Sequence, residues 1–172
     1  MAERHYMVVD GRRDHSFRVP RPDLSAFTGS PDACSGCPEE GSSWAAEQVA
    51  SWLGDRRLRP HFGPALAAVR HGDPTALPVL AGIAADEEQP ALVRATALFE
   101  LGERLEPAHL QAVVAGAYDG DPLVRAASAR AGEGLPAAQR GQLIAHLLAA
   151  ELRTVRAAAA RALAASPARS LD

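Results

Sequence analysis

Apolar residues recur at three- and four-residue intervals from about residue 42 onward, the spacing that places them on one face of an α-helix. Proline falls at the start of several of these segments and glycine follows others, as expected at the two ends of helices. The pattern predicts a series of helices, at residues 42–53, 58–70, from 73 onward, and at 90–103, 107–118, 122–132, 136–150 and 152–165.

A short motif in these helices repeats with a fixed period. Arg94, Arg125 and Arg156 are equally spaced along the chain, and each stands between valine and alanine. Leucines of the alternate helices are equally spaced as well, with a slightly longer period, at Leu77, Leu110 and Leu143. One helix pair cannot bury its apolar stripe alone, whereas stacked pairs share a continuous core. The sequence therefore predicts an all-α fold, a solenoid of antiparallel helix pairs.

The repeated arginines have a structural interpretation. We expect each to donate hydrogen bonds to carbonyl groups or to an acidic turn residue of its own or the neighbouring repeat, such as Glu88, Asp119 or Asp121. The alternative is a row of arginines that binds phosphate. Apolar residues around the motif are predicted to face inward at Val93, Ala97 and Leu98, and small residues to allow close helix approach at Ala95, Ala126 and Ala157.

The best copy of the motif resembles a known repeat family. Asp121-Pro122-Leu123-Val124-Arg125-Ala126-Ala127-Ser128-Ala129 is similar to the second helix of short bacterial HEAT repeats, and the resemblance covers about residues 73–165. It implies a scaffold that binds a protein partner on a concave face lined by the second helix of each pair. No catalytic motif accompanies the repeats, so we expect a protein that is not an enzyme.

Residues 1–42 have a different character. Their prolines and glycines predict an irregular arm, with a short strand at residues 6–9 and extended backbone at residues 20–22. The predicted domains are therefore 1–42 and 43–172. Trp44 and Trp52, eight residues apart, are expected on one helix face that packs into the core or against the arm.

Charge and hydropathy exclude some classes of partner. The formal net charge is −3, so no overall positive field attracts nucleic acid. No apolar run is long enough to span a membrane, and residues 1–5 do not begin a signal peptide. As written, the chain is expected to stay where it is made, unless it is a fragment whose export signal lay upstream.

Candidate chemistry is confined to the arm, where Cys34 and Cys37 form a C-x-x-C motif. Two thiols at this spacing can remain free, form a local disulfide, bind a metal or attach haem. Zinc needs four ligands, and the further ligands available nearby are His15 and His5. His15 is alternatively a structural residue in a turn rich in arginine and aspartate.

The sequence around this C-x-x-C motif resembles the last haem-binding segment of bacterial multihaem c-type cytochromes that carry a C-terminal HEAT or tetratricopeptide array. The matching residues include Asp14-His15-Ser16-Phe17-Arg18 and the run from Ser30 to Cys37. The resemblance implies haem c on Cys34 and Cys37, His15 as an axial ligand, and a periplasmic location. The proximal histidine of that family falls on Pro38. The leading functional hypothesis is a scaffold related to these cytochromes, and the alternative is electron transfer through haem or a metal.

Overall fold

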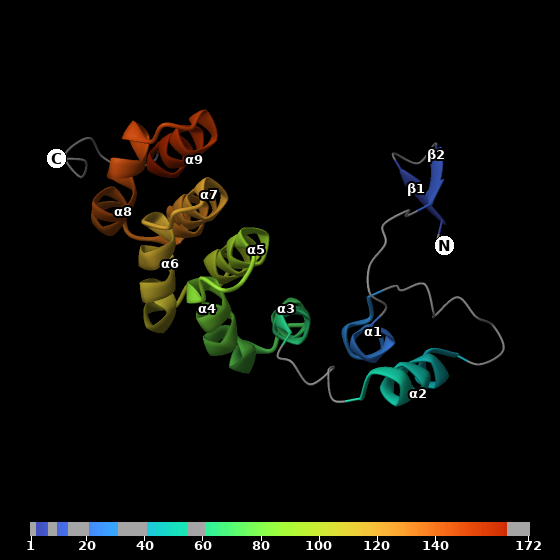
Figure 1. Cartoon of the computed structure of the whole chain (residues 1–172). Helices are drawn as coiled ribbons and strands as arrows, with labels where there is room; N and C mark the ends of the chain where they lie inside the picture. Colours follow the sequence, from blue (N-terminus) through green and yellow to red (C-terminus); the bar gives the residue numbers. More distant parts are fainter. Residues whose placement is uncertain (1–2, 7–9, 14–20, 31–40, 55–60, 165–172) are drawn as a thin grey trace. The chain divides into compact units, whose positions relative to one another are not determined.

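A computed structural model describes residues 3–6, 10–13, 21–30, 41–54 and 61–164. The chain divides into two compact units, Met1–Pro64 and Ala65–Asp172 (Figure 1). The sequence predicts a boundary after residue 42, where the helical repeats are expected to begin. The division into compact units does not test where the repeats begin, so this boundary stays a prediction. Within the described ranges, no helix is long and apolar enough to cross a membrane.

The first unit combines a hairpin with two helices. Strands β1 (Glu3–Tyr6) and β2 (Asp10–Arg13) pair antiparallel, with Glu3 opposite Arg13 and Tyr6 opposite Asp10. Helices α1 (Pro22–Thr28) and α2 (Gly41–Leu53) contact each other. The helical class is therefore confirmed for most of the described chain, and the hairpin is the exception.

Helix α1 begins at Pro22, the last residue of the segment predicted as extended backbone. Pro22 occupies its first turn, where a helix needs no N–H donor, and Gly29 closes it with a φ of 69°. Arg21 donates to Asp23 at 2.9 Å, and this ion pair holds the pKa of the Asp23 carboxyl below its ordinary value. The proline therefore starts a helix here instead of preventing one.

The second unit is helical. Helix α3 (Phe62–Arg70) begins before the boundary between the units and continues into the second one. The main helices that follow are α4 (Leu77–Ala85), α5 (Ala91–Gly102), α6 (Leu110–Ala117), α7 (Pro122–Ala131), α8 (Ala137–Ile144) and α9 (Arg153–Leu163). Short 3₁₀ turns join them at η2 (Pro74–Ala76), η3 (Pro107–His109), η4 (Gly132–Gly134) and η5 (Ala145–Ala149). The positions of these helices confirm the sequence prediction.

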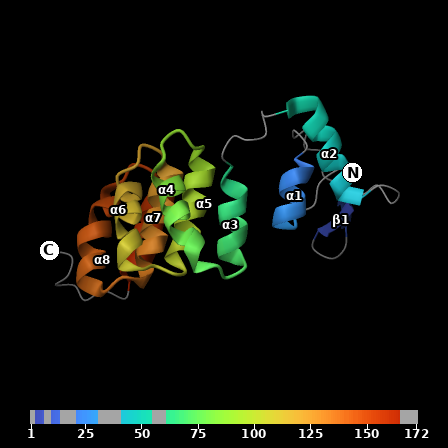
Figure 2. The ribbon, with the colours of Figure 1, turned by 90° about the horizontal axis from the view of Figure 1, so that it is seen from below.

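These helices form two rows (Figures 1 and 2). Helices α4, α6 and α8 contact one another in order and form the first row. Helices α5, α7 and α9 do the same and form the second row, and each second-row helix packs on the first-row helix that precedes it. Equivalent residues of successive repeats therefore lie side by side along a row.

The core follows the period of the repeated arginines. Two positions of the repeated motif are buried in all three second-row helices. The first is Val93, Val124 and Val155, and the second is Ala97, Ser128 and Ala159. The predicted inward positions Val93, Ala97 and Leu98 are confirmed. Of the small residues predicted to allow close helix approach, Ala95 is buried and Ala126 is half-buried. Ala157 is exposed, because no further described helix covers that side of α9.

The repeated arginines bind the turn that precedes their own helix. One guanidinium nitrogen, Nη1, donates to two backbone carbonyls in each repeat, at distances between 2.6 and 3.2 Å. The accepting carbonyl pairs are Glu87 and Gln89 for Arg94, Asp119 and Gly120 for Arg125, and Ala150 and Glu151 for Arg156. The structural interpretation of these arginines is confirmed, since they connect the first helix of a pair to the second.

Arg94 also joins two repeats. Its Nη2 donates to the Asp119 carboxylate at 2.9 Å, and both side chains are nearly buried, at 10% and 12% exposure. Asp119 additionally accepts from the backbone N–H of Asp121 at 2.7 Å. The position equivalent to Asp119 in the next repeat is Ala150, so the sequence cannot repeat this ion pair for Arg125.

The tryptophans of α2 are not buried in a core, and packing against the undescribed part of the arm stays a prediction. Trp44 and Trp52 are both exposed, and Trp52 retains 72% of its surface. The residues of α2 that are buried are small or aliphatic, Ala45 and Val49. The expectation that the indole rings fill a core is therefore wrong, because the buried face of this helix is centred on Ala45 and Val49 and both tryptophans lie to one side of it.

Candidate functional site

The predicted cofactor and metal ligands lie outside the part of the chain whose side chains are described. Cys34, Cys37 and His15 fall in ranges that the structure does not describe, and His5 is described only as a backbone position in β1. Haem or metal binding by these residues stays a prediction. Elsewhere, the described residues contain no group of three or more histidine, cysteine, aspartate or glutamate side chains placed to hold a metal.

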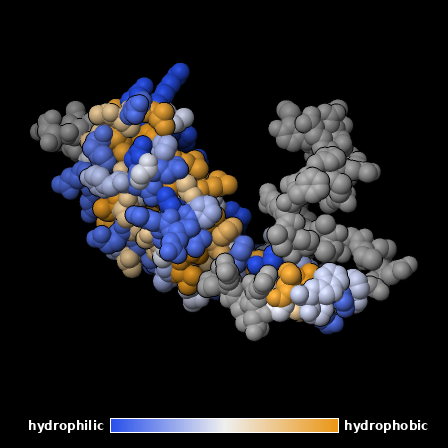
Figure 3. All heavy atoms as spheres, in the orientation of Figure 1, coloured by the Kyte–Doolittle hydropathy of each residue, from blue (hydrophilic) through white to orange (hydrophobic). Residues whose placement is uncertain are grey.

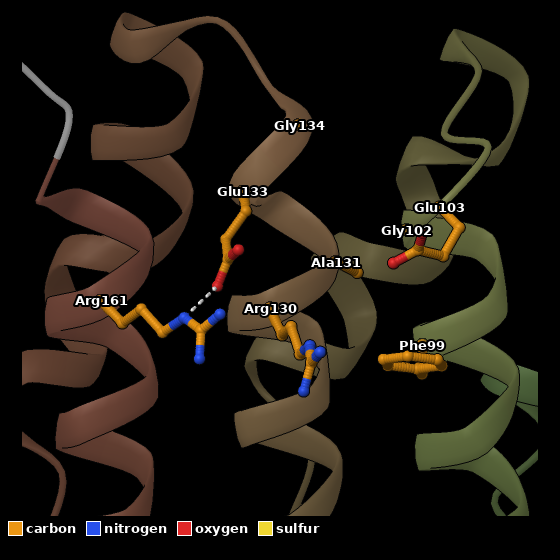
Figure 4. Close-up of a pocket in the computed structure, with 8 residues that line it drawn as sticks. All are labelled: Phe99, Gly102, Glu103, Arg130, Ala131, Glu133, Gly134 and Arg161. Carbon is orange, nitrogen blue, oxygen red and sulfur yellow. Dashed lines mark ion pairs between the residues drawn. The ribbon is translucent and has the colours of Figure 1, made fainter.

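The second-row helices carry a surface hollow of about 260 Å³. It spans α5, α7, η4 and α9, and Figure 4 shows the side chains that enter it. Its lining consists of Phe99, Gly102, Glu103, Arg130, Ala131, Glu133, Gly134 and Arg161. The side chains that line it supply two guanidinium groups, two carboxylates and an aromatic ring.

Three lining residues occupy one position of the repeat. Phe99, Arg130 and Arg161 are spaced like the repeated arginines and lie on α5, α7 and α9. Because the second-row helices pack side by side, these residues form a continuous line across the row. One position of the repeated motif is therefore a buried valine in every repeat. Another position is exposed and holds an aromatic ring in the first repeat and a guanidinium group in the next two.

Arg130 is oriented by the aromatic ring beside it. Its guanidinium carbon lies 4.7 Å from the centroid of the Phe99 ring, within the range of a cation–π contact. A cation–π contact leaves the N–H groups of a guanidinium available for hydrogen bonds. No described residue accepts a hydrogen bond from the Arg130 side chain. The hollow thus holds a positioned donor group whose hydrogen bonds are met by solvent or by a ligand.

Arg161 and the two glutamates complete the charges of the hollow. Arg161 lies 3.5 Å from the Glu133 carboxylate, and both side chains are accessible to solvent, so this ion pair contributes little stability. Glu103 enters the hollow from the end of α5 (Figure 4). Two positive and two negative groups therefore line the site, with the glutamates about one helical turn beyond the line of Phe99, Arg130 and Arg161 along the chain.

Apolar residues extend this surface toward the other end of the helices. Leu92 and Leu123 occupy equivalent positions on α5 and α7, with 68% and 47% of their surface exposed. Between the leucines and the arginine line lie small residues at Thr96, Ala127 and Ala158. We call the exposed surface formed by these residues and the hollow the binding face.

The sequence predicted this side of the repeats as a partner surface but did not single out Phe99, Arg130 or Arg161. The signal was present, because the three share the period already found for Arg94, Arg125 and Arg156. Only the packing shows which residues at that period are exposed. Figure 3 shows hydrophilic and hydrophobic residues interspersed over the second unit in the view drawn, without one continuous apolar area.

A second hollow of similar size lies on the first row, between α6 and α8. Its lining is mostly apolar and includes Leu110, Val114 and Leu143. At its edge, the Tyr118 ring stacks on His146 with centroids 4.4 Å apart. The His146 Nε2 is 3.2 Å from the Ala117 carbonyl oxygen, which favours the tautomer protonated at that nitrogen. The hydrogen bond and the stacking connect η5 with the end of α6. None of the residues that line this hollow is charged.

Comparison with known proteins does not assign this chain to a family. No protein-family model matches the sequence, and no curated protein and no solved structure matches it.

Proposed function

We propose that this chain is a non-enzymatic protein-interaction module, built as a HEAT-like solenoid of antiparallel helix pairs. The observation that carries the proposal is the binding face, where Leu92, Leu123 and Phe99 are exposed beside Arg130 and Arg161. Exposed apolar residues that share one face of neighbouring helices, unlike single scattered ones, support an interaction surface. Aromatic and arginine side chains are also the types most often dominant in protein interfaces.

The solenoid interpretation is supported by the repeated contacts. Each copy of the motif uses its arginine to bond the turn between its two helices, and each buries valine at the same position. Repeats of this kind expose equivalent residues along one side, which produces an extended binding surface. A partner that runs across α5, α7 and α9 would meet the same sequence position three times.

Photo-crosslinking in the native host tests the proposed face. We expect a photoreactive phenylalanine analogue at Leu92 or Leu123 to give discrete crosslinked products, because both side chains would lie under the partner. Val79 on α4 is the control, since it is apolar, 56% exposed and on the first row. Products of equal yield from Val79, or none from either leucine, would contradict the proposal.

A second candidate function rests on the C-x-x-C motif. We propose that Cys34 and Cys37, with His15, hold haem c or a metal in its place, because the sequence around them is similar to a haem segment of multihaem cytochromes. Expression in a periplasm with haem-attachment machinery is then expected to give a Soret band that Cys34→Ser removes. Metal analysis of the same two proteins tests the other version. A wild-type protein with neither a Soret band nor bound metal excludes this candidate.

A further inference from the structure

The charges of the hollow restrict what kind of segment can occupy it. Glu133 follows Arg130 by three residues, and Glu103 follows Phe99, the counterpart of the arginines on α5, by four. At the helical rise of about 1.5 Å per residue, these offsets separate the backbone positions of the two lines by about 4.5–6 Å along the helix axes. The side chains of Arg161 and Glu133 approach each other to 3.5 Å between the lines. An occupant of one charge sign would be attracted by one line and repelled by the other. The complementary occupant therefore carries both signs at this separation.

An extended peptide has a similar spacing. Alternate side chains of an extended chain point the same way and are about 6.6 Å apart. A segment that lies along α7 can therefore place an acidic residue beside Arg130 and Arg161 and, two positions away, a basic residue beside the glutamates. In the opposite direction, the next alternate residue lies over Ala127, where the small side chain leaves room for an apolar group, and Leu123 is one turn further.

The side chains of the hollow are available for such an occupant. The Arg130 guanidinium lies over the Phe99 ring without a hydrogen-bond acceptor among the described residues. The Arg161–Glu133 contact is long and exposed, so exchange of either partner for a charged ligand group costs little. Gly102 and Gly134 add no side chain to the lining of the hollow.

We propose that the binding face recognises an extended segment of a partner protein in which a basic, an acidic and an apolar residue occupy alternate positions. This inference rests on the proposed function and names the chemistry of its partner. Arg130 and Arg161 bind the acidic residue, Glu103 and Glu133 bind the basic residue, and Ala127 and Leu123 contact the apolar one.

Selection from a displayed library of random peptides tests the motif on the full chain. We expect the enriched peptides to share a basic and an acidic residue two positions apart, followed or preceded by an apolar residue at the same spacing. A synthetic copy of the best peptide should lose about tenfold or more in affinity for the Arg130→Glu and Arg161→Glu double variant, because hydrogen bonds between charged groups are lost. Arg153→Glu is the control, since Arg153 is exposed on α9 but does not line the hollow.

A variant in which the arginines and the glutamates of the hollow are exchanged for residues of opposite charge gives the decisive comparison. A protein with Arg130→Glu, Arg161→Glu, Glu103→Arg and Glu133→Arg should bind a peptide whose acidic and basic residues are exchanged, and should not bind the original one. Enriched peptides without the alternating charge pair, or binding unaffected by Arg130→Glu and Arg161→Glu, would overturn the inference. If such peptides still lose binding on Leu92→Asp, the face is an interaction surface and only its proposed partner chemistry is wrong. If no peptide is enriched, the inference also fails, while crosslinking at Leu92 still tests the proposed function.

Discussion

Asp119→Ala is expected to lower the free energy of unfolding of the helical body by about 3–5 kcal/mol. The substitution removes the carboxylate that Arg94 contacts at 2.9 Å and leaves the guanidinium nearly buried without its counter-charge. It also removes the acceptor for the Asp121 N–H. The Arg94 Nε already has no hydrogen-bond partner, so the remaining bonds to the Glu87 and Gln89 carbonyls cannot satisfy the group. Urea denaturation followed by circular dichroism measures the change.

Asp121→Ala provides the matched control for this prediction. Asp121 stands two residues away, and its exposed carboxylate accepts the Leu123 N–H at 2.8 Å as the N-cap of α7. Loss of an N-cap costs about 1 kcal/mol, so the second substitution should have a clearly smaller effect. Equal losses for Asp119→Ala and Asp121→Ala would show that the contact between the repeats contributes no more than a cap.

Gly102→Ala is expected to destabilise the protein by about 1–3 kcal/mol, although alanine is normally the better residue in a helix. A Cβ at this position would lie 2.6 Å from the Cα of Ala131 and 3.0 Å from its Cβ. The obstacle is backbone, which cannot rotate away as a flexible side chain can. Helices α5 and α7 would have to separate at the point where the first two second-row helices meet. Thermal and urea denaturation report the loss.

Gly82→Ala is the comparison within the same protein. Gly82 lies inside α4, and a Cβ there meets nothing within 4 Å. Alanine at this position is expected to stabilise the protein by roughly 0.5–1 kcal/mol, because helical glycine loses more conformational entropy on folding. The two identical substitutions should therefore act in opposite directions. A Gly102→Ala protein as stable as the wild type would show that α5 and α7 do not approach so closely.

The helices were predictable because their signals are local. Proline at the start, glycine at the end and apolar residues at helical spacing place α5 and α7 almost to the residue, and the period of the motif identifies the equivalent positions. Pro22 was misread because proline is compatible both with extended backbone and with the first turn of a helix. The exposure of Trp52 was also mispredicted, since hydrophobicity alone does not say which face of α2 finds a neighbour.

The candidate site was predictable only as a region. The sequence indicated that the second helices carry the partner surface, and the structure adds that Phe99 and Arg130 are in contact there. The arginines of the repeated motif and the arginines of the hollow recur with the same period, yet Arg94 is nearly buried and Arg161 is exposed. The period cannot separate these roles, because it states which residues are equivalent and not which side of the helix faces the next one.

The sequence by itself determined the repeating unit, the ends of most helices and the residues that point inward, because these depend on interactions between residues close in the chain. Only the tertiary structure decided that Arg94 pairs with Asp119 and that Gly102 meets Ala131. The same packing brought Phe99, Arg130 and Arg161 together in one hollow. The physical reason is that these contacts join neighbouring helices, and their distances depend on how closely the helices of the two rows pack.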